Sequence, residues 1–251
     1  MATLPRLRPR CFYDLVVEIA IIRPGPIVGQ MVHPYLNRRA GREPVRYPHP
    51  CLEPILERTL GIPIFQEQLL RIAMTAAGFS GGEAEELRRA MGFKRSRQRM
   101  ERMEERLRAG MQERGFTPEA QEDTLRQITA FALYGFPESH SASFALIAYA
   151  SAYLKCHHPS AFLAGLLNAW PMGFYGPATL VKDAERHGVR VRPIDVTRSD
   201  WRCTLEPGAS MPDVRIGLRY ARHFRAASAE QLMAERARTP FTSPADLAAR
   251  V

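Results

Sequence analysis

The sequence lacks the short motifs by which several large classes of self-contained enzyme are recognised. It has no Asp-x-Asp pair, no glycine-rich Walker loop and no Gly-x-Ser-x-Gly elbow, and its seven aspartates are scattered over 251 residues. Metal-dependent transfer of phosphate-bearing groups needs clustered carboxylates, because Mg2+ ions are held between them. The other two motifs supply a phosphate cradle or a nucleophilic serine. The sequence therefore offers no self-sufficient active site of these kinds.

Cysteine and long apolar runs are also scarce. The four cysteines, Cys11, Cys51, Cys156 and Cys203, lie far apart and form no Cys-x-x-Cys pair, which excludes the usual zinc-ligand spacing and a disulfide framework. The longest apolar stretch, residues 142–154, is shorter than the ~20 residues that span a bilayer. It contains two tyrosines and two serines, so we interpret it as a buried helix. Free cysteines are typical of a reducing cytoplasm, where we expect the protein, with no membrane attachment.

Lysine is rare, whereas arginine is abundant. Three of the 35 Lys and Arg residues are lysines, so 32 are arginines, and the formal net charge is +9. Arginine offers a planar fork that binds a phosphate with two hydrogen bonds. A basic surface attracts polyanions, nucleic acid above all. An arginine-rich codon usage explains the choice of Arg over Lys but not the excess of positive charge, so the composition favours a nucleic-acid partner.

Glycine and proline divide the chain into short segments, most of which have helical periodicity. The fold is therefore predicted to be mainly α with a few short strands. In the first part of the chain, helices are expected over residues 12–22, 64–77, 80–91 (opened by a capping box), 96–114, 117–133 and 139–157. After residue 170 we expect a helix over 178–187, strands over 189–194 and 214–218 only, and short helices over 220–224, over 228–238 and from 243.

Four cations gather where the helix over 80–91 ends. Arg88 and Arg89 precede Gly92, and Lys94 and Arg95 follow it. Two adjacent arginines, a glycine turn and a lysine are candidates for clamping a triphosphate. Cations also stabilise a helix C-terminus without any ligand, so the spacing leaves both interpretations open.

A stripe of arginines lies along the next expected helix, over residues 96–114. It consists of Arg95, Arg99, Arg102 and Arg106. Residues three or four positions apart share one face of an α-helix. The stripe is a candidate for contacts with the phosphate backbone of DNA. A solvated face with Glu–Arg pairs explains the same spacing, and this alternative also stays open.

A turn at residues 135–138 leads into the long helix expected over 139–157 and places Ser139 and His140 in its first turn. Free backbone N–H groups there favour an anion, and the histidine could donate to a phosphate or stack on a base. A lone histidine is also commonly a packed or capping residue. The buried face of this helix is expected to consist of Ala142, Ala145, Leu146, Tyr149, Tyr153 and Cys156.

Several short stretches occur in a fixed order along the chain: residues 23–26, 65–68, 87–94, 134–136 and 139–144. Together they resemble the fingers domain of the bacterial DNA polymerase III alpha subunit, the C-family of DNA polymerases. Three further stretches, residues 4–15, 169–175 and 192–196, resemble the error-prone, damage-inducible branch of that family. Each motif is weak alone, but their joint order is specific and the likeness covers nearly the whole chain.

The resemblance implies a domain organisation. Residues 1–205 are expected to form a multi-helix fingers domain and residues 206–213 a linker. Residues 214–251 are expected to be the truncated start of a tandem helix-hairpin-helix region. Its turn, residues 222–225, reads Arg-His-Phe-Arg and lacks the glycines usual in such turns, which argues against DNA binding by this hairpin.

The resemblance also implies roles for the candidate residues. Arg88 and Arg89 match the arginines that bind the triphosphate of the incoming nucleotide. Lys94, Ser139 and His140 lie in matching motifs near the same nucleotide. The arginine stripe fits contacts with DNA.

The function expected on this basis is binding of incoming dNTP and of template–primer DNA in DNA-templated nucleotidyl transfer. In the error-prone branch this implies translesion synthesis within DNA repair and replication. Whether the chain is itself an enzyme stays open. The family's metal-holding aspartates lie in a palm domain that precedes the fingers and is absent from this sequence. We therefore expect the Mg2+ of the parent enzyme on that palm, none on this chain alone, and no polymerase activity from the chain by itself.

Further partners implied by the resemblance are the sliding clamp, a RecA-like accessory protein and a catalytically inactive Y-family-like polymerase homologue. A separately encoded palm-containing chain is another candidate partner. Two alternatives remain. The chain could be a non-catalytic basic helical module that binds DNA electrostatically, or a fragmentary reading frame without its own activity.

Overall fold

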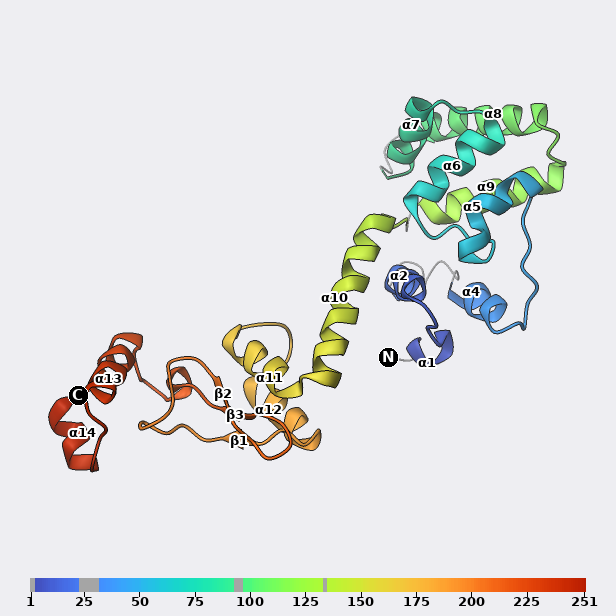
Figure 1. The fold of residues 1–251 in the computed structure, drawn as a ribbon. Helices are drawn as coiled ribbons and strands as arrows, with labels where there is room; N and C mark the ends of the chain where they lie inside the picture. The colour runs from blue at the N-terminus through green and yellow to red at the C-terminus, as the bar shows by residue number, and fades with distance from the viewer. Residues whose placement is uncertain (1–2, 23–31, 93–96, 133–134) are drawn as a thin grey trace. The chain divides into compact units, whose positions relative to one another are not determined.

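The computed structural model describes residues 3–22, 32–92, 97–132 and 135–251, and these are mainly helical with one small sheet (Figure 1). The predicted fold class is thereby confirmed. The chain forms two compact units, residues 1–147 and 148–251, which we call the N-terminal and C-terminal units and describe separately. The predicted limits of the fingers domain, linker and hairpin region divide the chain differently and stay predictions.

The first helices of the N-terminal unit are α1 (Leu4–Leu7), α2 (Phe12–Ile21) and α4 (Val32–Arg39). The apolar residues of α2 recur at the spacing that places them on one side of a helix. They bury this side against α4, against the segment before α6 and against the first turns of α10. The core formed in this way consists of Leu7, Val16, Val17, Ala20, Ile21, Tyr35, Leu36, Ile62, Ile64, Phe65 and Ala145.

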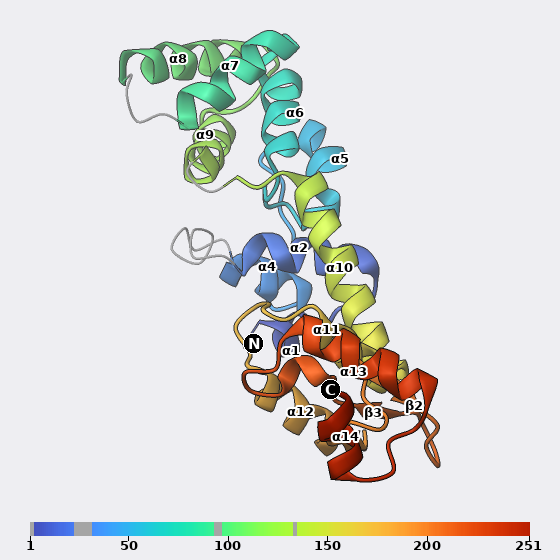
Figure 2. The ribbon, with the colours of Figure 1, turned by 90° about the vertical axis from the view of Figure 1, so that its left-hand side faces the viewer.

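Four longer helices form a second core in the same unit and lie together in Figures 1 and 2: α6 (Gln66–Ala77), α7 (Gly81–Gly92), α8 (Arg97–Glu113) and α9 (Pro118–Ala132). They confirm the helices predicted over 64–77, 80–91, 96–114 and 117–133. Short turns precede them: η1 (Pro50–Leu52), α5 (Glu53–Leu56) and η2 (Glu57–Thr59). Helix α8 contributes Leu107 and Met111 to this core, and both are buried.

Helices α6 and α8 cross closely at Gly110. A Cβ atom at this position would lie 2.1 Å from the carbonyl oxygen of Ala77 and 2.8 Å from its Cα. Both residues are buried. The missing side chain therefore sets how near the two helices approach.

Gln68 fixes the start of α6. Its Oε1 accepts hydrogen bonds from the backbone N–H groups of Ile64 (2.8 Å) and Phe65 (3.0 Å), and its Nε2 donates to the carbonyl of Ile55 (3.1 Å) and to Thr59 Oγ1 (2.8 Å). The side chain is buried, and these contacts satisfy both donors and both acceptor positions of the amide. The Phe-Gln-Glu-Gln stretch is thus an anchor between α6 and the preceding turns.

The long helix α10 (Glu138–His157) is confirmed, but its predicted buried face is wrong. Of the residues in that face only Ala145 is fully buried, whereas Leu146 is 61% exposed and Tyr149 is 55% exposed. Tyr153 and Cys156 are exposed as well. Ser141, which was not part of the predicted face, is also buried. The helix's own apolar residues are distributed over all of its sides. Its sequence therefore has no polar stripe to indicate which side faces the core.

A three-stranded sheet and two helices organise the C-terminal unit: α11 (Pro159–Asn168), α12 (Pro177–Arg186), β1 (Val191–Arg192), β2 (Thr204–Glu206) and β3 (Asp213–Arg215). The strand order is β1-β3-β2, with β1 parallel and β2 antiparallel to the central β3. The sequence predicted β1 and β3 but missed β2, a three-residue edge strand. Residues 207–212, within the predicted linker, connect β2 to β3.

The chain ends in η3 (Leu218–Tyr220), α13 (Ala226–Arg238) and α14 (Pro244–Arg250). The two longer helices agree with prediction, but the short helix expected over 220–224 is wrong, because only a single turn forms and it ends at Tyr220. In the turn before α13, His223 has a φ of +60°. This left-handed conformation favours glycine, so the hairpin turn keeps a glycine-like backbone although it lacks glycine.

Candidate nucleic-acid interface

Helix α7 positions the first pair of candidate arginines. The helix begins with the predicted capping box: the carboxylate of Glu83 accepts from the backbone N–H (2.7 Å) and the hydroxyl (2.9 Å) of Ser80, and Ser80 Oγ accepts from the N–H of Glu83 (3.3 Å). Two turns later Arg88 and Arg89 lie near the C-terminal end of α7, at the surface.

The two arginines converge on one carboxylate, that of Glu85. Arg88 donates through Nε (2.8 Å) and Nη2 (2.6 Å), and Arg89 donates through Nε (3.1 Å). Hydrogen bonds from Arg88 and then Arg89 lower the pKa of Glu85 to about 2, so this carboxylate is ionised at neutral pH. The arrangement holds two guanidinium groups around a single anion at the surface.

The sequence analysis did not identify Glu85 as the partner of these arginines, although the sequence contains a signal for this pairing. It precedes the two arginines by three and four positions, which is the spacing of ion pairs along a helix. The pairing also shows that these arginines can be satisfied within α7 alone, so both interpretations of the cation cluster keep support. Lys94 and Arg95, which complete that cluster, lie outside the described residues.

The arginine stripe on α8 is described in part. The side chain of Arg99 lies outside the described set, and Arg102 is exposed. Arg106 contacts Glu83 of α7 at 3.8 Å and lies 5.4 Å from the ring centre of Phe79. Its neighbour Arg108, absent from the prediction, pairs with Glu104 and with Glu122 of α9. Such exposed pairs are weak, so the face stays accessible to a stronger anion.

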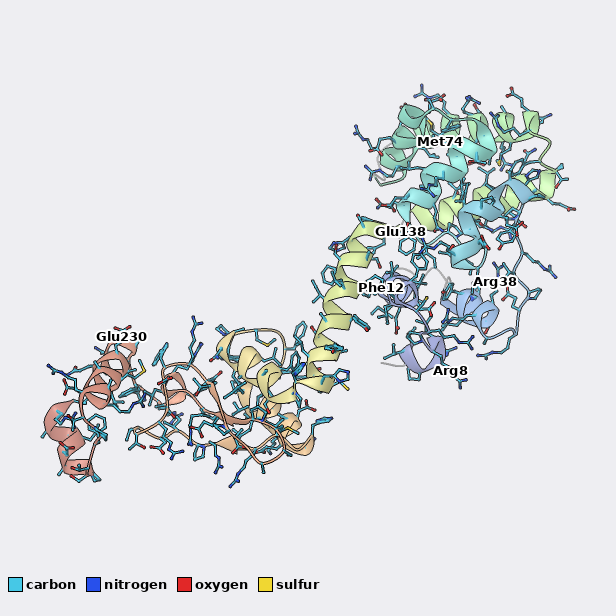
Figure 3. The ribbon with its side chains drawn as sticks, viewed as in Figure 1. Arg8, Phe12, Arg38, Met74, Glu138 and Glu230 are labelled. Carbon is cyan, nitrogen blue, oxygen red and sulfur yellow. The ribbon has the colours of Figure 1, made fainter. Side chains whose placement is uncertain are left out.

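A third group surrounds the start of α10, where Glu138 lies beside α2 (Figure 3). The Tyr13 hydroxyl donates to the Glu138 carboxylate (2.8 Å), and the guanidinium of Arg58 lies 3.5 Å from the Tyr13 ring centre. Burial, and then the neighbouring Glu138, raise the pKa of Tyr13 well above its usual range. The backbone N–H of Glu138 donates to the Glu67 carboxylate (3.0 Å).

This group joins two stretches that are far apart in the sequence. Phe65 and Phe136 form a parallel bridge, and Gln66 bonds the carbonyls of Gly135 and Phe136 through its side chain and its backbone N–H. No local sequence pattern in either stretch indicates that the two are in contact, because the contact depends on how they pack in the folded unit.

Ser139 and His140 are both exposed in the first turn of α10. The His140 ring makes edge contacts with Phe136 (5.1 Å between ring centres) and Phe144 (4.7 Å). Ser139 accepts a hydrogen bond from Ser143 through its carbonyl. Within the described ranges, no hydrogen bond, ion pair or ring contact joins these two residues to the arginines of α7. Their convergence on one nucleotide stays a prediction.

Two further observations concern metals and membranes. In the part of the chain that the structure describes, no three His, Cys, Asp or Glu side chains are placed to hold a metal ion. The same part includes no helix that is both long and apolar enough to cross a membrane.

Comparison with known proteins places the chain. A family model described as "Bacterial DNA polymerase III alpha subunit finger domain" matches residues 1–115, and one described as "Helix-hairpin-helix motif" matches residues 188–251. An "Error-prone DNA polymerase" of Methylococcus capsulatus is 55% identical over 270 residues, covering 100% of this chain. The chain belongs to the bacterial DNA polymerase III alpha subunit family. Within that family it is similar to the error-prone branch, as the motifs predicted.

Two other relatives give a similar result. An "Error-prone DNA polymerase 2" of Agrobacterium fabrum is 54% identical over 98% of the chain, and an "Error-prone DNA polymerase" of Bordetella bronchiseptica is 55% identical over all of it. The chain accounts for 26%, 23% and 24% of the three relatives. It therefore spans about a quarter of the length of the curated relatives it matches.

Proposed function

We propose that this chain is the fingers portion of an error-prone DNA polymerase and binds the incoming deoxynucleoside triphosphate and template–primer DNA. The reaction served is DNA-templated nucleotidyl transfer, in translesion synthesis during DNA repair and replication, in the bacterial cytoplasm. The observation that carries the proposal is the convergence of Arg88 and Arg89 on the single carboxylate of Glu85, in a chain whose first 115 residues match a polymerase fingers domain.

The proposed binding step is an exchange of anions. A triphosphate presents several negative oxygens, whereas Glu85 presents one carboxylate, so the triphosphate makes more charge-assisted hydrogen bonds to the same two guanidinium groups. Guanidinium groups held in place in this way also stabilise the charge that develops on phosphoryl oxygens during transfer. In the same proposal, Lys94, Ser139 and His140 contact the nucleotide, and the arginine stripe of α8 contacts the DNA backbone.

The metal and the remaining partners are proposed from the resemblance alone. A carboxylate cluster outside this chain would hold Mg2+, and the metal ion would neutralise the phosphates. A palm-containing polypeptide, the sliding clamp, a RecA-like protein and an inactive Y-family-like homologue are the proposed protein partners.

Titration of the chain with dNTP, without metal, tests the proposal. Arg88→Ala combined with Arg89→Ala is expected to weaken triphosphate binding about 100-fold, because each arginine contributes charge-assisted hydrogen bonds. Glu85→Gln is expected to strengthen binding about two- to fivefold, because it removes an exposed competitor. The pKa of Glu85 lies near 2, so this gain should not vary between pH 5 and 9.

Helix α9 offers a matched control, since Arg126 pairs with Asp123 at 3.6 Å on an exposed surface. Arg126→Ala and Asp123→Asn should leave triphosphate binding unchanged. If the parent chain binds DNA but no triphosphate, the non-catalytic DNA-binding module is the better description. Equal effects of the α7 and α9 variants would show that Arg88 and Arg89 act only through net charge.

A further inference from the structure

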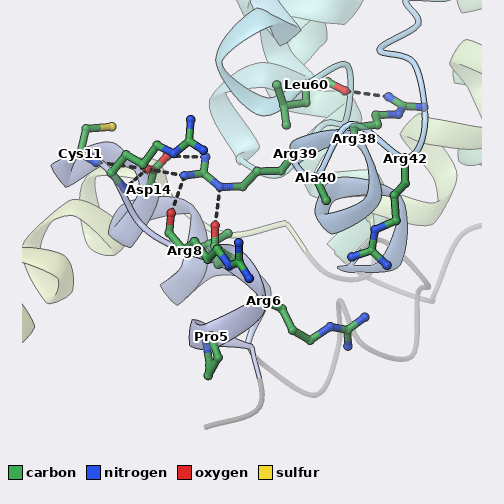
Figure 4. Close-up of a pocket in the computed structure, with 12 residues that line it drawn as sticks. Pro5, Arg6, Arg8, Cys11, Asp14, Arg38, Arg39, Ala40, Arg42 and Leu60 are labelled. Atoms are coloured by element: carbon green, nitrogen blue, oxygen red, sulfur yellow. Dashed lines mark hydrogen bonds and ion pairs between the residues drawn. The ribbon is translucent and has the colours of Figure 1, made fainter.

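A second basic region lies away from α7 and α8 in the sequence, at the N-terminal helices. A cavity of about 730 Å3 opens between α1, the segment that follows it, and the end of α4 (Figure 4). Its lining includes a single acidic residue, Asp14, and six arginines: Arg6, Arg8, Arg10, Arg38, Arg39 and Arg42. Positive charge therefore greatly exceeds negative charge around this cavity.

Two of the six arginines build the walls of the cavity. Arg39 forms a two-pronged ion pair with Asp14 (2.7 and 2.6 Å) and donates to the carbonyls of Leu7 and Arg8. Arg38 bonds Glu43 and the carbonyl of Leu60. These contacts use the two guanidinium groups to fix the backbone of α1 and of the segment before α6.

Asp14 completes this framework. Burial alone would raise its pKa, but hydrogen bonds from Arg39 and from the backbone N–H groups of Arg10 and Cys11 outweigh burial and lower the pKa below its ordinary value. The carboxylate is therefore ionised and fully engaged at neutral pH. It neutralises Arg39, and Glu43 pairs with Arg38, so that four arginines of the cavity stay uncompensated.

The remaining four arginines have no such structural task. The side chains of Arg6, Arg8, Arg10 and Arg42 are exposed, and within the described ranges none of them forms an ion pair or a side-chain hydrogen bond. In Figure 4 the labelled Arg6, Arg8 and Arg42 extend around the same recess. Four uncompensated like charges on one concave surface repel each other and concentrate counter-anions there.

The lining also indicates the class of anion. Its uncharged members are Pro5, Leu7, Cys11, Ala40 and Leu60, so no aromatic side chain among these lining residues is present for a base to stack on. Arginines without aromatic partners bind phosphate oxygens irrespective of base sequence. A recess suits a flexible strand better than a stiff duplex, because bending a short duplex costs energy.

We propose that this cavity binds the phosphodiester backbone of single-stranded DNA, without base specificity, through Arg6, Arg8, Arg10 and Arg42. The site uses none of the residues assigned above to triphosphate or to DNA. An experiment on this cavity can therefore fail or succeed independently of the experiment that tests the proposed function.

The test compares two charge-reversal pairs in the full chain, with a labelled oligo-dT as the probe. Arg6→Glu with Arg8→Glu alters the cavity. Arg71→Glu with Arg126→Glu changes net charge by the same amount at exposed positions of α6 and α9. Each lost contact with single-stranded DNA removes about 0.7 from the slope of log affinity against log salt. Loss of two contacts should thus lower the slope by about 1.4 and weaken binding about 25-fold at 0.1 M salt relative to the control pair.

Inorganic triphosphate and a duplex of the same length are the other probes. We expect the cavity variant to bind triphosphate as the parent does, and to lose little affinity for duplex. Equal losses of oligo-dT affinity in the cavity and control variants would overturn the proposal. A loss of triphosphate affinity with unchanged oligo-dT affinity would also overturn it, because the cavity would then hold a free anion.

A second measurement needs no variant and so does not depend on variant folding. Modification of the parent chain with an arginine-specific reagent, read by mass spectrometry, should show Arg6, Arg8, Arg10 and Arg42 protected by saturating oligo-dT, while Arg71 stays reactive. Unchanged reactivity of the four arginines at saturation would rule the cavity out as the binding site.

Discussion

At Gly110 a single methyl group has no room. In Gly110→Ala the new Cβ would lie 2.1, 2.7 and 2.8 Å from the carbonyl oxygen, carbonyl carbon and Cα of Ala77. All three are backbone atoms of a buried residue, so no side-chain rotation relieves the contact. Helices α6 and α8 must move apart, and the core between them, which includes Leu69 and Leu107, must loosen.

The size of the effect follows from two opposing terms. Overpacking a well-packed core costs about 1–3 kcal/mol, and we take about 3 here because two helices must shift. Alanine is a better helix former than glycine by about 1 kcal/mol. The net expectation is a loss of about 2 kcal/mol in the free energy of unfolding, which for a unit of this size lowers Tm by about 4–8 °C.

Urea and thermal unfolding followed by far-UV circular dichroism measure this change. Gly82→Ala is a matched control on α7, where the nearest atom to the new Cβ is Ser80 Oγ at 4.0 Å. Gly165→Ala on α11 is a second, because its Cβ would meet nothing within 4 Å. Both should be neutral or stabilising by up to about 1 kcal/mol. A Gly110→Ala protein as stable as its parent would refute the close crossing of α6 and α8.

Three further changes test other parts of the fold. In Asp14→Asn we expect a loss of about 2 kcal/mol at pH 7, between the values for exposed and buried pairs. Because the folded pKa of Asp14 is lowered, its contribution to stability is present above the unfolded pKa of about 4 and is lost as pH falls through the folded value. In urea unfolding from pH 7 to pH 2, the free energies of unfolding of the variant and the parent should therefore converge in acid. A difference that stays constant with pH would contradict the ion pair. Gln68→Leu should cost about 3 kcal/mol or more in urea unfolding, because it strands the buried partners that Gln68 now bonds; a loss under 1 kcal/mol would mean that they find other partners. His223→Gly should stabilise the C-terminal unit by about 0.5 kcal/mol in thermal unfolding, because relief of the left-handed strain exceeds the added chain entropy; destabilisation would show that the His223 side chain makes contacts of its own.

The longer helices of the N-terminal unit could be predicted because their signals are local, whereas the short helices α1, α4 and α5 were not expected. Periodic apolar residues, glycine stops and the Ser80–Glu83 capping box each act within a few residues, and the structure has a helix at each of these places. The ion pairs of Glu85 with Arg88 and Arg89 were also within reach, since their spacing is a property of one helix.

The features that sequence reasoning missed depend on distant neighbours. Strand β2 has only three residues and exists because β3 pairs with it, and the face that α10 buries is decided by which helix meets it. Likewise, the hydrogen bond between Tyr13 and Glu138 joins residues 125 positions apart. Whether Arg88, Arg89 and His140 serve one ligand is a question of the same kind, which the binding experiments address.

The exposure of α10 has a practical consequence for all of these measurements. Leu146 and Ile147 are each 61% exposed, and Phe144, Tyr149, Tyr153 and Leu154 are between 44% and 55% exposed. An apolar surface of this kind promotes self-association of a purified protein and binds hydrophobic dyes. We expect the chain to oligomerise as its concentration rises, so titrations should be run dilute, with light scattering to separate ligand-induced changes from association of the chain with itself.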